Sequence, residues 1–108
     1  MAETNASVLD LAYLRQQTAG DADLERDLLA LLLSQCASLL PLLTCPDDEA
    51  RRRSAAHSLR GAAAALGARR LAAAAAEIEA GKKPSIAIEQ AVEEVREAIG
   101  PLLERGAG

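Results

Sequence analysis

The sequence is almost without aromatic residues: its 108 residues include one tyrosine and no phenylalanine or tryptophan. It also lacks an excess of basic charge, because it has 12 lysines and arginines but 16 acidic residues, which gives a net charge of -4. Proteins that bind nucleic acid broadly use a basic surface and often stack bases on aromatic rings. We therefore expect no nucleic-acid partner, and a core built from leucine, isoleucine, valine and alanine.

Residues that bind metals or form disulfides are equally scarce. The chain has two cysteines, Cys36 and Cys45, and a single histidine, His57. A structural zinc site needs four Cys or His ligands, and a metal–carboxylate oxidase bundle needs paired Glu-x-x-His motifs, so both classes are excluded. We expect two reduced thiols, no metal site and a cytoplasmic location.

Patterns typical of strands are absent, because no segment alternates β-branched or aromatic residues with polar ones. The abundant alanine favours helix. We predict helices over residues 8–18, 22–43, 48–66 and 68–80, and a last helix from residue 86 to about 99 or beyond. Four long helices joined by short loops predict an all-α fold, an antiparallel up-down-up-down four-helix bundle with an additional short N-terminal helix.

The ends of these segments carry further expectations. Residues 1–7 lack the basic and apolar regions of a signal peptide and are expected to form a disordered tail. One domain covers residues 8–105, and residues 106–108 are expected to fray. Asp10 should help to cap the first helix, and Ser85 should cap the last. Gly100-Pro101 should end or bend that last helix.

One segment has an alternative interpretation as a membrane span. Residues 28–46 contain no charged residue and are nearly long enough to cross a bilayer. Ser34 and Pro41 interrupt them, and the acidic residues near both ends give no positive-inside bias. We therefore interpret the segment as a buried bundle helix and expect no membrane. Its leucines cannot all face one core, so Leu29 and Leu33 either pack under the first helix or lie exposed for a partner.

The single histidine lies in the middle of the third predicted helix. At about 100° per residue, Ala56, Leu59, Ala63 and Leu66 share one apolar face and His57 falls roughly opposite. Around His57 the same projection places a mixture of arginines and very small residues: Arg53, Arg60, Gly61, Ala64 and Ala68. An imidazole is a nucleophile near neutral pH and can carry a covalent intermediate. The alternative is a solvated helix face with an incidental histidine.

The segment around His57 resembles the signature of the histidine phosphotransfer (HPt) domain. Residues 56–61 read Ala-His-Ser-Leu-Arg-Gly, residues 65–67 read Ala-Leu-Gly, and Leu71 follows at the family's spacing. One departure is Arg60, where the family usually has lysine; the charge is kept, but a rigid fork replaces a flexible ammonium. The likeness extends from about Val8 to the end of the last helix.

The resemblance implies a function as a phosphorelay intermediate. His57 would accept a phosphoryl group from an aspartyl-phosphate receiver domain and pass it to another response-regulator receiver. The expected partners are receiver domains and a hybrid sensor kinase, and the expected state is a monomer. Mg²⁺ would belong to the receiver, so the chain needs no cofactor. It has no Gly-rich phosphate loop for ATP, so we expect a phosphocarrier and not an enzyme. The alternative is an adaptor that binds a receiver or kinase without phosphotransfer.

The resemblance also gives roles to the neighbours of His57. Arg60 would stabilise the charge of the phosphoryl group, and Gly61 would allow a partner to approach closely. Glu79 occupies a position where the family often carries a polar side chain that hydrogen-bonds Nδ1 of the histidine; the alternative is a solvated glutamate. In the family, the receiver docks on an apolar patch beside the histidine. The expected partner-binding residues are Arg53, Ala64, Ala68, Leu29 and Leu33.

Overall fold

The computed structural model describes residues 6–45 and 47–107, and over these residues the chain is helical without strands. The helices are α1 (Leu11–Gln17), α2 (Ala22–Leu43), α3 (Glu49–Ala65), α4 (Arg69–Glu79) and α5 (Ile88–Ala107). This confirms the all-α prediction of four packed helices preceded by a short one. Residues 1–5, most of the expected tail, lie outside the described residues, as do Pro46 and Gly108.

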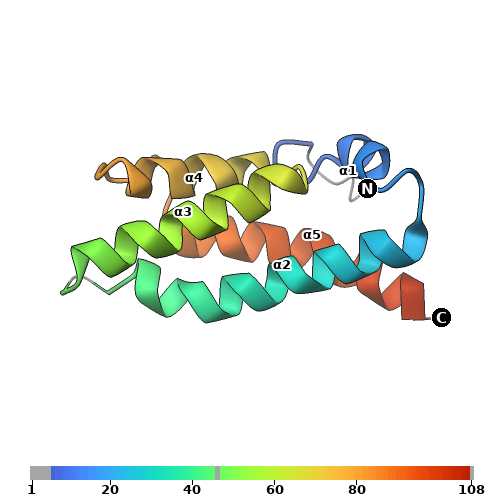
Figure 1. Cartoon of the computed structure of the whole chain (residues 1–108). Coiled ribbons are helices and arrows are strands. Elements are labelled where there is room, and N and C mark those ends of the chain that lie inside the picture. Colours follow the sequence, from blue (N-terminus) through green and yellow to red (C-terminus); the bar gives the residue numbers. More distant parts are fainter. Residues whose placement is uncertain (1–5, 46, 108) are drawn as a thin grey trace.

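Helices α2 to α5 run alternately up and down along the long axis of the molecule (Figure 1). Helix α3 packs most extensively on α4, α2 packs on α3 and α5, and α4 packs on α5. Each of the four helices therefore has two neighbours, and together they enclose one core. Helix α1 lies across the end of the bundle where α3 turns into α4 (Figure 1).

The core is aliphatic, as the composition requires. Its largest fully buried side chains are leucine, isoleucine and valine, including Leu32, Leu59 and Ile78. Much of the buried surface of α3 and α4 is alanine: Ala55, Ala56 and Ala63 on α3, and Ala74 and Ala75 on α4. Because the distance between packed helices depends on the side chains at their contact, these small residues let the two helices approach closely.

Aspartate side chains fix where the first three helices begin. Asp10, Asp21 and Asp48 each accept a hydrogen bond from the backbone N–H three residues further on, at 3.1, 3.0 and 2.9 Å. Each bond satisfies a donor that the first turn leaves without an intrahelical partner. Helix α1 consequently begins at Leu11 and not at Val8 as expected.

The last helix differs from the prediction at both of its ends. Ser85 does not cap it, because the helix begins only at Ile88. The N–H and hydroxyl of Ser85 instead donate to the carboxylate of Glu77 at 2.9 and 3.0 Å. The backbone of α5 stays helical through Pro101 to Ala107. Pro101 is exposed, and its ring costs the helix one backbone hydrogen bond without ending it. Of the alternatives expected at Gly100-Pro101, an early end of the helix is excluded, and the helix continues beyond Ile99.

The N-terminal segment is tied to the turn between α3 and α4. The N–H of Asp10 donates to the carbonyl oxygen of Gly67 at 3.0 Å, and the N–H of Arg70 donates to Ser7 at 2.7 Å. The side chain of Asp10 also pairs with Arg69 at 2.8 Å. These contacts hold α1 against the end of the bundle and brace the turn on which the α3–α4 pair depends.

Helix α2 is the apolar segment that raised the membrane alternative. Among the described residues, it is the one helix long and apolar enough to cross a bilayer by length and composition. Core helices of bundles meet the same criteria, and α2 packs against both α3 and α5. Leu29, Leu32 and Cys36 are buried, whereas Leu24 and Leu31 are 42% and 53% exposed. Packing therefore explains the buried apolar side chains of α2, but it does not explain the exposed Leu24 and Leu31.

Gly67 gives a stability prediction. Its φ is +82°, and an added Cβ would lie 3.0 Å from the carbonyl oxygen of Asp10. We expect Gly67→Ala to lower the free energy of unfolding by about 1–2 kcal/mol, because the left-handed conformation strains any other residue. Urea unfolding followed by circular dichroism measures this change.

Gly61 supplies the matched control. It lies inside α3, and an added Cβ would meet no atom within 4 Å. Gly61→Ala should therefore raise the free energy of unfolding by roughly 0.5–1 kcal/mol, the usual gain of alanine over glycine within a helix. Equal effects of the two substitutions would show that the turn at Gly67 is not constrained.

Candidate functional site

Helix α3 places His57 on its solvent-facing side. The opposite side carries the buried residues Ala55, Ala56, Leu59 and Ala63, and the His57 side chain is 65% exposed. The hydrophobic face therefore fixes the rotation of the helix, and that rotation turns the imidazole outward.

Glu79 reaches His57 from the neighbouring helix. Its Oε2 lies 2.6 Å from Nδ1 of the imidazole. The two residues stand on opposite arms of the α3–α4 hairpin, at comparable distances along the chain from the turn at Gly67. No hydrogen bond of Nε2 occurs among residues 6–45 and 47–107. A carboxylate at Nδ1 favours the tautomer with its proton on that nitrogen, and it leaves the lone pair on Nε2.

Arg60 joins the same carboxylate. Its Nε donates to Oε1 of Glu79 at 2.6 Å, while its Nη2 lies 3.4 Å from Nδ1 of His57. Arg60 lies one helical turn after His57, so both side chains reach the same part of α4. The sequence did not predict this ion pair, because no spacing rule connects residues on separate helices.

These contacts determine the charge of Glu79. The pKa of Glu79 is lowered below its ordinary value of 4.5, first by the hydrogen bond with His57 and, against some desolvation, by Arg60. Glu79 is therefore a carboxylate at neutral pH. It shares its negative charge between the imidazole and the guanidinium group.

Small residues flank the imidazole on one side. Gly61 and Ala64 are exposed, and nothing lies within 4 Å of the position that a Gly61 side chain would take. Ala68 is different, because it is fully buried. Helix α3 ends at Ala65 and Ala68 is the N-cap of α4, so a projection along α3 does not apply to it. Its expected place on a docking surface is wrong.

Arg53 points along α3 away from His57. Its Nε donates to Glu49 at 3.1 Å, and a Cβ on Gly81 would lie 2.5 Å from its Nη2. The guanidinium group thus lies over the end of α4. Whether it contacts a partner stays a prediction.

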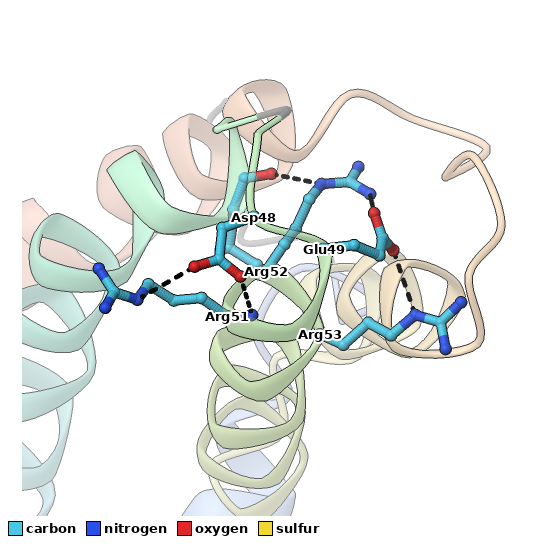
Figure 2. A network of polar contacts seen from close by, with 6 residues as sticks. Asp48, Glu49, Arg51, Arg52 and Arg53 are labelled. Atoms are coloured by element: carbon cyan, nitrogen blue, oxygen red, sulfur yellow. Dashed lines mark hydrogen bonds and ion pairs between the residues drawn. The ribbon is translucent and has the colours of Figure 1, made fainter.

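The other arginines of the basic run are engaged at the start of α3, as Figure 2 shows. Arg52 donates to the carbonyl oxygen of Leu43 at 2.9 Å and pairs with Glu49 at 3.7 Å. Arg51 pairs with Asp48, also at 3.7 Å. These positive charges therefore lie beside carboxylates of the same turn, and they do not form a free basic patch.

The leucines proposed for docking have unequal positions. Leu29 is only 3% exposed and lines a small hollow together with Leu11 of α1 and Leu102 of α5. Leu29 is thus part of the core and not of the exposed surface, in line with the packing alternative and against a role in docking. Leu33 is partly buried against the core. The strongly exposed leucines are Leu24 and Leu31, two turns apart on one face of α2. These two leucines are seven residues apart, a spacing that places both on one helix face. The sequence analysis did not use this spacing and named Leu29 and Leu33 instead.

No metal site accompanies this arrangement in the part of the chain that the structure describes. No group of three or more His, Cys, Asp or Glu side chains there is placed to hold an ion. The candidate site consists of an outward imidazole, one carboxylate, one guanidinium group and a flank of small residues.

Comparison with known proteins identifies one matching family. The family model described as Hpt domain matches residues 14–104, nearly the whole chain and all of the candidate site. No curated protein and no solved structure matches the sequence.

The lowered pKa of Glu79 leads to a prediction about pH. In His57→Ala the pKa of this carboxyl should rise toward 4.5, because the largest cause of its lowering is removed, and Arg60→Ala should also raise it. Carbon NMR titration of the side-chain carboxyl measures both changes. Folding lowers this pKa, so the contacts stabilise the protein above pH 4.5. That contribution is lost as the pH falls through the folded-state pKa.

The carboxyl of Asp10 is the internal reference for this titration. Its pKa is also lowered, chiefly by the hydrogen bond from the backbone N–H of Tyr13 and, against some desolvation, by Arg69. It lies at the end of the bundle, so substitution of His57 should leave it unchanged. A Glu79 pKa that does not respond to His57→Ala would show that the 2.6 Å contact is absent in solution.

Proposed function

The chain belongs to the Hpt domain family, and from that membership we propose that His57 is the residue that carries the phosphoryl group. The family implies histidine phosphotransfer within a phosphorelay, and its members are phosphocarriers. His57 is the only histidine of the sequence. The observation that supports the assignment best is its exposed ring, with Nδ1 held by Glu79 and Nε2 without a hydrogen bond among the described residues.

The proposed reaction is an exchange between an aspartate of a receiver domain and Nε2 of His57. The lone pair of Nε2 attacks the phosphorus of the aspartyl phosphate, the P–O bond to the aspartate breaks, and its electrons leave with the carboxylate. The reverse exchange delivers the phosphoryl group to a second receiver. Such transfer depends mostly on positioning and on charge neutralisation. The receiver supplies its own Mg²⁺ and acidic pocket, so this chain needs no cofactor.

Each neighbour of His57 has a part in this proposal. Glu79 holds the proton on Nδ1 and therefore keeps the lone pair on the exposed nitrogen. The Nη groups of Arg60 can bind phosphoryl oxygens while its Nε stays with Glu79, because a guanidinium group has separate donors. Gly61 and Ala64 leave space for the rim of the receiver's pocket.

His57→Gln tests the central assignment. Incubation with a receiver charged by acetyl phosphate should give the wild type an acid-labile, base-stable phosphoryl label, and the variant none, because glutamine has no comparable nucleophile. The same assay separates a phosphocarrier from an adaptor, which would bind the receiver without taking up label. If the variant retains the label, His57 is not the residue that carries the phosphoryl group.

Gly61→Leu tests the approach of the partner. The side chain would project into open space beside His57, so the helix should remain intact while receiver-dependent transfer slows by roughly tenfold or more. Loading by the small donor phosphoramidate should be nearly unchanged, because that molecule does not need the space. The rate of labelling by each donor is the measurement.

Gly100→Leu is the matched control for this variant. Gly100 also lies within a helix, and an added Cβ there would meet no atom within 4 Å, but it is on α5. Transfer should be normal in this variant. If Gly61→Leu also transfers normally from the receiver, close approach at this position is unnecessary.

A further inference from the structure

One carboxylate serves both the nucleophile and the cation of the site. Glu79 contacts Nδ1 of His57 through Oε2 and Nε of Arg60 through Oε1, each at 2.6 Å. The side chain of Glu79 is 29% exposed, so this charge is only partly screened by water. A phosphoryl group on Nε2 would therefore lie across the ring from a fixed negative charge.

We propose that Glu79 holds phospho-His57 in a readily transferred form, so that this protein is a short-lived donor and not a store of phosphoryl groups. The inference rests on the proposed function, because it requires phosphorylation of His57. It concerns a different property, which is how quickly the phosphoryl group leaves again.

The first argument concerns the proton on Nδ1. When Nε2 forms its bond to phosphorus, a ring that keeps the Nδ1 proton becomes positively charged. The carboxylate of Glu79 accepts the hydrogen bond from that proton and stabilises the charged ring. On release, the P–Nε2 bond breaks and its electron pair returns to Nε2, while phosphorus bonds to an oxygen of the acceptor. The ring then leaves as neutral imidazole, whereas a ring without the Nδ1 proton would leave as a less stable anion.

The second argument concerns Arg60, and it too predicts easier release of the phosphoryl group when Glu79 is present. Its single positive charge is already shared with Glu79 before any phosphoryl group arrives. The guanidinium group can therefore offer less attraction to a phosphoryl dianion than an unpaired cation would. With a neutral side chain at position 79, Arg60 would stabilise the phosphoryl group more strongly.

Glu79→Gln separates charge from position. The amide oxygen of glutamine can accept the same hydrogen bond from Nδ1, but the negative charge is removed. Both proteins are loaded with phosphoramidate, which needs no receiver, the donor is removed, and phospho-His57 is followed by phosphorus NMR at neutral pH. We expect phospho-His57 to decay at least about threefold more slowly in Glu79→Gln, since the charge acts across a short, partly desolvated distance.

Glu93→Gln is the matched control. It makes the same change of charge on α5, where the exposed Glu93 pairs with Arg96. Its phosphoryl lifetime should equal that of the wild type. Decay of Glu79→Gln at the wild-type rate or faster overturns the inference, and so does an equal slowing in Glu93→Gln. If the wild type takes no label on His57 at all, the proposed function itself fails, and the two failures are thus distinguishable.

Discussion

The close packing of α3 on α4 is the constraint on which the site depends. The imidazole and the carboxylate that holds it stand on different helices, and a 2.6 Å contact between them requires the two backbones to lie near each other. Alanine at buried positions of both helices permits this approach. The turn at Gly67, braced by Asp10, then sets the register between the two arms. A core with larger residues at this interface would separate His57 from Glu79.

The site balances charges more than it concentrates them. His57, Arg60 and Glu79 form a compact group in which the carboxylate is shared, and the basic residues before them are paired within their own turn. The family usually has lysine at the position of Arg60. A guanidinium group can bind a carboxylate through one edge and present its other donors elsewhere, which a single ammonium group does less well. The presence of arginine therefore fits the presence of Glu79.

Much of the fold follows from local sequence signals, and the exceptions have physical reasons. Helix α2 has the predicted bounds, because Asp21 caps it and the apolar run continues to Leu43. The outward direction of His57 follows from helical periodicity alone. Ala68 was misplaced because the projection was carried beyond the end of α3. Ser85 was misassigned because the last helix begins at Ile88 and Ser85 instead donates two hydrogen bonds to Glu77 on another element. The Arg60–Glu79 pair joins separate helices, and only the assembled bundle shows it.

The hairpin geometry has a consequence for how this protein can vary. His57 and Glu79 meet because nearly equal lengths of helix lead from the turn at Gly67 to each of them. An inserted or deleted residue in either arm would rotate one side chain by about 100° around its helix axis and end the contact. Exchange of a side chain leaves that register intact. Descendants of this sequence should therefore accumulate substitutions between these two positions while keeping the length of the segment constant.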